Sequence, residues 1–228
     1  MTRPVQTPEV FEDAASCGEA LAARVADQLA RFLEKGPAVL AVSGGSTPAP
    51  FLEALGREAV LGAPGLTVTL VDERWVPPQH ADSNEALVRR SLSTGTAMRF
   101  APLYAGESPE ADARAATARL DGLVAAGARA VVVLGMGADG HTASLFPELP
   151  ELDALLNPRA PPALAATRPD APHTRITWNL AALCGWSSAT WLHVTGARKR
   201  GLVEARELAL PIHRVLDHAP TTRIVWAP

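Results

Sequence analysis

The sequence predicts an α/β fold, a single domain with a mostly parallel sheet and helices on both of its faces. Short apolar runs rich in valine and leucine recur along the chain, each followed by a polar or glycine-containing loop. Apolar strands that alternate with helices are typical of parallel sheets covered on both faces. The 228 residues, of which 47% are hydrophobic, can form one sizeable core, so we expect one domain over residues 1–228.

The first unit of strand, loop and helix follows a long helix. Residues 12–35 carry apolar side chains at helical spacing and end at a glycine-proline stop signal, which predicts an amphipathic helix. Residues 38–42, AVLAV, have the composition of a buried strand. We expect Ser46 or Thr47 to cap the next helix, with Pro48 as its first position.

The same unit recurs three times. Its strands are expected at residues 66–71, 130–135 and 190–196, and helices are expected over residues 85–92 and 197–208. Right-handed crossovers bring the carboxyl ends of parallel strands to one edge, so the loops after all four strands should converge there. Ligands of open α/β sheets bind at that edge, which makes these loops the candidate site.

Charge and composition exclude several classes of function. The net charge is −3, the pI is near 6.1 and like charges do not form runs, so we expect no nucleic-acid partner. The first residues lack the apolar core of a signal peptide, and no stretch approaches the roughly 18 to 20 apolar residues of a membrane span. We therefore expect a cytoplasmic protein without a membrane partner. Cys17 and Cys184 lie far apart, so neither a disulfide framework nor a zinc knuckle is indicated.

A proline-rich segment separates the third unit from the fourth. Residues 147–172 contain seven prolines. Such a segment is either an ordered surface connection or a rim or lid over the strand edge, and both interpretations stay open at this point.

The loop after the first strand has the composition of a phosphate site. SGGSTP at residues 43–48 has two glycines that let the backbone approach a ligand, then hydroxyl residues that open a helix. Free N–H groups and the positive end of the helix dipole favour an anion there. No GK[ST] follows and GxGxxG is absent, so an ordinary tight turn is an equal alternative. The candidate residues are Ser43, Gly44, Gly45, Ser46 and Thr47.

Two other loops carry charged residues. Asp72, Glu73 and Arg74 follow the second strand, where they form either a surface salt bridge or part of a site. Lys199 falls in the first turn of the helix after the fourth strand, where a cation opposes the helix dipole unless it shares an anion. That position favours a bound phosphate, although a plain basic helix face is the simpler alternative.

The loop after the third strand, LGMGADGHTASLFP at residues 134–147, sets an acid and a base among glycines. Asp139 can orient the imidazole of His141, and histidine titrates nearest neutrality, which suits general-base work on water. A capping aspartate beside an exposed histidine is the alternative. No GxSxG elbow supports a Ser144 nucleophile, and no HExxH or other ligand spacing supports a metal.

Together these segments resemble the 6-phosphogluconolactonase family, which belongs with the glucosamine-6-phosphate deaminases to a wider sugar-phosphate isomerase-like group. The matching stretches cover nearly the whole chain: SGGSTP at 43–48, DERWVP at 72–77, DSN at 82–84, LGMGADGHTASLFP at 134–147, RIT at 175–177 and TGARK at 195–199. The resemblance implies a Rossmann-like domain that hydrolyses 6-phospho-D-glucono-1,5-lactone to 6-phosphogluconate, the second step of the oxidative pentose phosphate pathway.

The resemblance also implies a role for each candidate residue. An activated lactone needs neither a metal nor a cofactor, and the expected partner is the sugar-phosphate lactone alone, bound by a monomer or weak homo-oligomer. The implied roles are His141 as general base, Asp139 as its positioning acid, Arg74 on the oxyanion, Asp72 and Glu73 on Arg74 or sugar hydroxyls, and Ser43–Thr47, Lys199 and Arg175 on the phosphate.

Two other functions remain as alternatives. Deaminases of this group typically continue the histidine motif with Asn-Glu-Pro, whereas here Phe146 precedes the proline, and Arg74 stands where deaminases usually carry a tyrosine. Both differences favour the lactonase. The other alternative is a non-catalytic sugar-phosphate sensor, but this sequence shows no basic DNA-reading module in front of its first helix.

Overall fold

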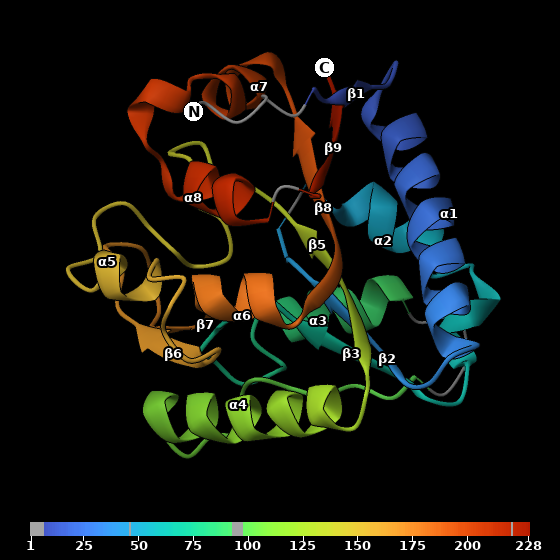
Figure 1. Cartoon of the computed structure of the whole chain (residues 1–228), viewed down its shortest axis with the longest axis horizontal. Coiled ribbons are helices and arrows are strands. Elements are labelled where there is room, and N and C mark those ends of the chain that lie inside the picture. The colour runs from blue at the N-terminus through green and yellow to red at the C-terminus, as the bar shows by residue number, and fades with distance from the viewer. Residues whose placement is uncertain (1–6, 46, 93–97, 220) are drawn as a thin grey trace.

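A six-stranded parallel sheet forms the centre of the computed structural model, which describes residues 7–45, 47–92, 98–219 and 221–228. The strand order is β1-β9-β8-β5-β2-β3, and every pairing in it is parallel (Figure 1). The prediction of a mostly parallel sheet is therefore confirmed. The strands are β1 (Glu9–Val10), β2 (Ala38–Val42), β3 (Leu66–Leu70), β5 (Arg129–Leu134), β8 (Ser187–Thr195) and β9 (Arg223–Ala227).

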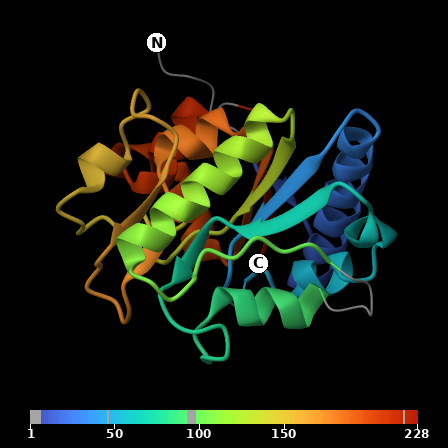
Figure 2. The same cartoon turned by 90° about the horizontal axis from the view of Figure 1, so that it is seen from below.

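Helices cover both faces of this sheet, as the sequence predicts. Helices α1 (Ala14–Leu33) and α2 (Ala49–Leu55) lie on one side, and α6 (Leu180–Gly185) and α8 (Pro211–His218) lie on the other (Figure 1 and Figure 2). Helix α1 begins at a capping box in which Asp13 accepts a hydrogen bond from the backbone N–H of Ser16. Its buried residues, among them Leu21, Val25, Leu29 and Phe32, recur at helical spacing, which confirms the predicted amphipathic helix.

The helices that follow β2, β3 and β8 need one correction. Helix α3 (Asn84–Leu92) and helix α7 (Ala197–Glu204) lie where the patterns predict, although α7 ends early and a short 3₁₀ turn, η2 (Arg206–Leu208), follows it. Helix α2 was expected to begin at Pro48 with a hydroxyl cap. Instead Pro48 occupies the capping position, where its side chain has no polar atom to make a cap hydrogen bond, and the Thr47 hydroxyl accepts a hydrogen bond from Lys199.

A second, three-stranded antiparallel sheet was not predicted. It has the order β4-β7-β6, with β4 (Asp72–Arg74), β6 (Leu164–Thr167) and β7 (Arg175–Trp178). The chain passes into it directly from β3, since the Val71 N–H bonds to Val42 of the large sheet while the Val71 carbonyl accepts from Trp178. Residues 72–74 are thus a strand rather than a loop.

The remaining helices surround this smaller sheet and the ends of the strands. Helix α4 (Pro109–Ala125) lies beside the small sheet, and the segment 147–172 contains α5 (Leu152–Leu155) and β6. That segment is therefore an ordered connection, and its Ala171 also lines the pocket described below. A short 3₁₀ helix, η1 (Ala59–Gly62), precedes β3.

One hydrophobic core joins both sheets, and the buried imidazole of His193 packs against Phe51 of this core. His193 of β8 is 1% exposed, and among the described residues neither of its ring nitrogens has a hydrogen-bond partner. Burial, with a contribution from the charge of Lys199, lowers the pKa of His193 to about 4, so this imidazole is neutral near pH 7.

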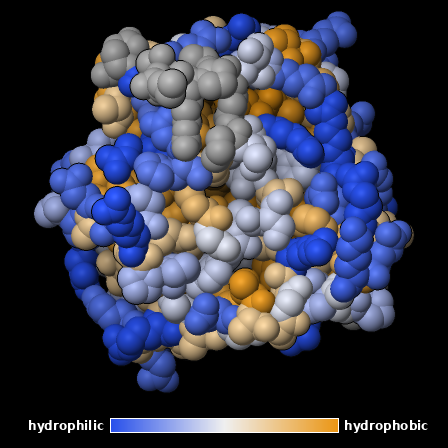
Figure 3. Space-filling model, viewed as in Figure 1, coloured by the Kyte–Doolittle hydropathy of each residue, from blue (hydrophilic) through white to orange (hydrophobic). Residues whose placement is uncertain are grey.

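The surface is mixed in character. On the face in Figure 3, hydrophobic residues appear in small separate patches between hydrophilic ones. Among the helices that the structure describes, none combines the length and the apolar character needed to cross a bilayer.

Candidate active site

A pocket of about 330 Å³ lies at the carboxyl ends of the central strands. Its volume is within the range of small-molecule sites in proteins. The loops after β2, β5 and β8 contribute to it, together with the first residues of the small sheet, so the predicted convergence of loops is confirmed. The pocket-lining residues that the sequence singled out are Ser43, Gly44, Gly45, Thr47, Asp72, Arg74, His141, Ser144, Arg175 and Lys199.

The loop after β2 is held against its neighbours on both sides. Ser43 is buried, and its hydroxyl accepts a hydrogen bond from the Gly135 N–H at 3.1 Å, which ties this loop to the one after β5. A Cβ placed on Gly44 would lie 2.0 Å from Oδ1 of Asn84, so only glycine allows this close approach. Ser46, the remaining candidate of this loop, lies outside the described residues.

Lys199 meets the same loop from α7. Its Nζ donates to the Thr47 hydroxyl at 3.4 Å, although the two residues are 152 positions apart in the chain. The Thr195 hydroxyl lies 3.5 Å from that of Thr47, which places three polar groups together. Burial lowers the pKa of Lys199, because transfer away from water disfavours the ammonium. The loop and the lysine therefore form one cationic, hydrogen-bonding end of the pocket.

His141 lies at the side of the pocket with Asp139 behind it. Nδ1 of His141 is 2.6 Å from Oδ1 of Asp139, which also accepts the backbone N–H of His141. A carboxylate only accepts hydrogen bonds, so in the neutral imidazole Nδ1 carries the proton and Nε2 keeps its lone pair. The Phe146 ring stacks on the imidazole at 4.0 Å and limits its rotation. A side chain on Gly137 would collide with this imidazole, since a Cβ there would lie 2.2 Å from it.

Two arginines lie opposite each other on the small sheet. Arg74 of β4 is paired in register with Arg175 of β7. Arg74 donates from Nη1 to the Asp82 carbonyl at 2.6 Å, and Arg175 donates from Nη2 to the Pro172 carbonyl at 3.0 Å. Their buried Nε atoms have no partner among the described residues. Burial lowers the pKa of Arg175, and the neighbouring Arg74 charge lowers it further, yet a guanidinium stays protonated at neutral pH.

The acids around the pocket differ in their surroundings. Asp72 is buried, lines the pocket and accepts the Ser144 hydroxyl at 2.6 Å. Ser144 is thus hydrogen-bonded to a carboxylate rather than to His141, which leaves it without the imidazole partner of a serine nucleophile. With Arg74, Arg175 and Lys199 around this one carboxylate, cationic side chains outnumber acidic ones in the described lining.

Glu73 was predicted to position Arg74 or to bind sugar hydroxyls, and the structure shows a contact with the Arg74 backbone but no place for Glu73 in the pocket lining. It is 1% exposed and does not line the pocket. Its Oε1 accepts the N–H groups of Arg74 and Asn84, and its Oε2 accepts the N–H of Glu85 and the hydroxyl of Ser83. Burial raises the pKa of Glu73 to about 7, against the opposing effect of the backbone hydrogen bonds. This carboxylate positions the start of α3 instead of binding a ligand.

Asn84 lines the pocket but was not among the candidate site residues predicted from the sequence. Its Nδ2 donates to the Asp72 carbonyl at 2.9 Å, whereas its buried Oδ1 has no partner among the described residues and borders the pocket. A buried acceptor without a donor is costly, so a ligand hydroxyl is a natural partner. Its place in the DSN stretch at 82–84 was the available signal.

Comparisons with known proteins agree with this geometry. A family model described as glucosamine-6-phosphate isomerases/6-phosphogluconolactonase matches residues 12–226. A 6-phosphogluconolactonase from Pseudomonas aeruginosa is 42% identical over 96% of this chain and 94% of its own length. One from Rhizobium meliloti is 40% identical over 96% of this chain and 97% of its own length.

Solved structures show the same fold. A putative 6-phosphogluconolactonase from Neisseria gonorrhoeae superposes with a TM-score of 0.82 at 35% identity, over 98% of this chain and all of that chain (100%). A monomeric glucosamine-6-phosphate deaminase also superposes, with a TM-score of 0.78 over 97% of both chains, but its 15% identity supports only a shared fold. The family match spans most of the chain and includes every loop of the pocket. The chain therefore belongs to the glucosamine-6-phosphate isomerase/6-phosphogluconolactonase family.

Proposed function

We propose that this protein is a 6-phosphogluconolactonase, which hydrolyses 6-phospho-D-glucono-1,5-lactone to 6-phospho-D-gluconate in the oxidative branch of the pentose phosphate pathway. The observation that carries the proposal is the placement of the His141–Asp139 pair and a cluster of cations around one pocket. The curated relatives that share 37–43% identity with most of this chain are 6-phosphogluconolactonases, which supports the same reaction.

His141 acts as the general base in this proposal. Its free Nε2 takes a proton from a water molecule while the water oxygen attacks the lactone carbonyl carbon. Asp139 stabilises the imidazolium that forms, because its carboxylate already accepts the Nδ1 proton at 2.6 Å. The tetrahedral intermediate then expels the ring oxygen, which takes the proton back from Nε2. General-base assistance of this kind is worth about 10² to 10⁴ in rate.

Arg74 stabilises the charge that develops on the carbonyl oxygen. It lines the pocket, and its guanidinium is already held by the Asp82 carbonyl, so little reorganisation is needed when the oxyanion forms. By analogy with other oxyanion donors, this contribution is about 3 kcal/mol. Asp72 and the free Oδ1 of Asn84 accept hydrogen bonds from sugar hydroxyls.

The substrate phosphate is held at the cationic end of the pocket. Ser43, Thr47 and the glycine backbone between them supply donors, and Lys199 supplies the positive charge. Arg175 adds a second charge from the small sheet. The phosphate does not react, so these contacts act before and during the reaction and set the KM rather than kcat.

The same proposal has consequences for location and assembly. Phosphorylated sugars are charged and are retained inside the cell, so the enzyme is expected to act in the cytoplasm, with the lactone as its small-molecule partner. The proposed assembly is a monomer or a weak homo-oligomer. One domain over residues 1–228 is proposed to carry the whole site.

The His141→Ala variant tests the assignment. Hydrolysis of freshly generated lactone is measured with the spontaneous rate subtracted, and kcat should fall at least a hundredfold while KM changes little. Turnover by the variant at close to the wild-type kcat would remove His141 from the mechanism. Ammonia release from glucosamine 6-phosphate would instead support a deaminase, and tight binding of sugar phosphates without turnover would support a sensor.

A further inference from the structure

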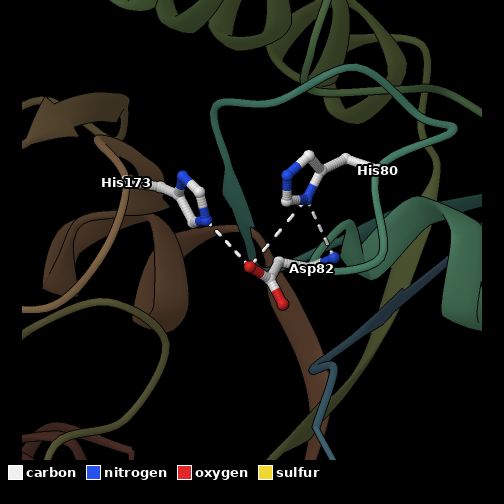
Figure 4. A group of neighbouring side chains, drawn as sticks. All are labelled: His80, Asp82 and His173. Atoms are coloured by element: carbon white, nitrogen blue, oxygen red, sulfur yellow. Dashed lines mark hydrogen bonds and ion pairs between the residues drawn. The ribbon is translucent and has the colours of Figure 1, made fainter.

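A second group of polar side chains lies outside the pocket. His80 and Asp82 belong to the segment between β4 and α3, and His173 belongs to the segment before β7. Figure 4 shows the two imidazoles on either side of the Asp82 carboxylate. Among the described residues, this is the one set of three histidine, cysteine or acidic side chains whose ligand atoms all lie within 4.8 Å of one another.

The distances in this group fit a small divalent ion. Nε2 of His173 is 2.9 Å from Oδ2 of Asp82, and Nδ1 of His80 is 3.9 Å from the same oxygen. Bonds of about 2.0 to 2.2 Å in a tetrahedral zinc site place the ligand atoms about 3.4 Å apart. The two observed distances lie on either side of that separation, and the two histidine nitrogens lie within 4.8 Å of each other, so shifts of about 1 Å bring all three atoms onto one ion.

The donor set and its exposure also suit an ion of this class. Two imidazoles and one carboxylate favour zinc and its first-row neighbours over magnesium or calcium, which prefer oxygen ligands. The Asp82 N–H donates to Nδ1 of His80, and Nε2 of His173 lies 2.9 Å from the Asp82 carboxylate, which only accepts hydrogen bonds. Zinc therefore replaces both hydrogen bonds and releases the Nε2 proton when it binds. The three side chains are 44%, 54% and 27% exposed, in chain order, which leaves a path for the ion and space for a water ligand.

The backbone conformation of His173 is one that the surrounding structure must hold in place, and it directs the imidazole towards the other two side chains. Its φ is +71°, a left-handed conformation that costs a residue with a Cβ roughly 1 kcal/mol or more. In this conformation the imidazole faces Asp82, 91 positions away in the chain, and lies edge-on to the His80 ring at 5.2 Å.

We propose that this group binds a divalent transition-metal ion, with zinc as the best fit. The ligand atoms are Nδ1 of His80, Oδ2 of Asp82 and Nε2 of His173, and the ion cross-links two segments at the rim of the pocket. The ion joins the segment whose Asp82 carbonyl holds Arg74 to the segment whose Pro172 carbonyl holds Arg175. Its role is structural, since it holds together the two segments that position these arginines. Binding itself does not depend on the proposed reaction.

Zinc binding to the chelator-treated full-length chain tests the proposal. Titration calorimetry with zinc chloride alone should show one equivalent bound with a Kd in the micromolar range, and zinc should raise Tm by a few degrees. X-ray absorption at the zinc edge should show nitrogen and oxygen ligands without sulfur. Because no substrate is present, failure of this test is separate from failure of the proposed hydrolase activity.

Two substitutions and a control locate the ion. His80→Ala removes an exposed side chain, and His173→Asn keeps a residue type that tolerates positive φ. Each should weaken zinc binding at least tenfold and abolish the rise in Tm, whereas His218→Ala, an exposed histidine of α8, should change neither. Absence of binding by the wild type at millimolar zinc overturns the proposal. Unchanged affinity in both variants overturns it as well, because the ion then lies elsewhere.

Discussion

Replacement of Asp139 by asparagine isolates the contribution of the carboxylate behind the proposed base. The Asp139→Asn side chain keeps the shape of aspartate but removes the charge 2.6 Å from Nδ1 of His141. Its amide can also donate to Nδ1, which would place the proton on Nε2 and block base action. We therefore expect kcat to fall while the folded structure and the KM change little.

The expected size of this loss follows from the geometry. With charge centres about 4 Å apart, a carboxylate stabilises an imidazolium by about 1 kcal/mol in bulk water and about 4 kcal/mol near a protein surface. The Asp139 side chain is 46% exposed, so an intermediate value of about 2 to 3 kcal/mol applies. That range corresponds to a loss of about 30- to 160-fold in kcat.

The assay follows hydrolysis of freshly generated lactone at pH 7, with the uncatalysed rate subtracted. Asp121→Asn, an exposed acid on α4, serves as the matched control and should keep the wild-type rate. A kcat for Asp139→Asn within twofold of wild type would refute the reasoning, since His141 would then need no carboxylate to orient it or to stabilise its charge.

Three further predictions concern binding, packing and pH. Lys199→Ala should raise the KM for the phosphorylated lactone at least tenfold with a smaller change in kcat, and an unchanged KM would place the phosphate elsewhere. Gly44→Ala should lower kcat/KM by at least tenfold, as measured in the same assay, because the new methyl displaces the Asn84 amide from the pocket. His193 is neutral when folded and protonates in the unfolded chain below about pH 6.5, so the wild type should lose about 2 kcal/mol of stability from this group between pH 7 and pH 5. Glu73 acts in the opposite sense, because its folded pKa is raised and its contribution to stability is present at low pH and lost as pH rises towards 7. Urea unfolding of His193→Leu beside the wild type therefore isolates the His193 contribution. If the free energy of unfolding changed with pH equally in both proteins, the prediction for His193 would be wrong.

The large sheet could be predicted because its strands are buried on both faces. Residues 38–42 are apolar throughout, residues 66–70 alternate apolar residues with the β-branched Thr67 and Thr69, and both runs are fully buried, so composition alone indicates them. The small sheet could not be predicted in the same way. Its β4 consists of two acids and an arginine, and it becomes a strand only because β7, about a hundred positions later, offers partners for its backbone.

The misassignment of Glu73 has the same origin. Successive side chains of a strand point to opposite faces, so Asp72 and Arg74 face the pocket while Glu73 faces α3. If residues 72–74 had been recognised as a strand, this alternation would have separated the three. The histidines at 80 and 173 illustrate a different limit, since only the folded chain brings their rings within 5.2 Å.

The passage from β3 to β4 without an intervening helix makes the two sheets neighbours across the pocket. The β2 loop and Lys199 are anchored to the large sheet, and Arg74 and Arg175 to the small one. A ligand that contacts both sets spans the junction between the sheets, so in the proposed mechanism the packing of the two sheets sets the distance between the β2 loop and Arg74. Tilting the small sheet by substitutions in its own packing would reset that distance, and with it the preferred length of sugar, without any change to the phosphate loop.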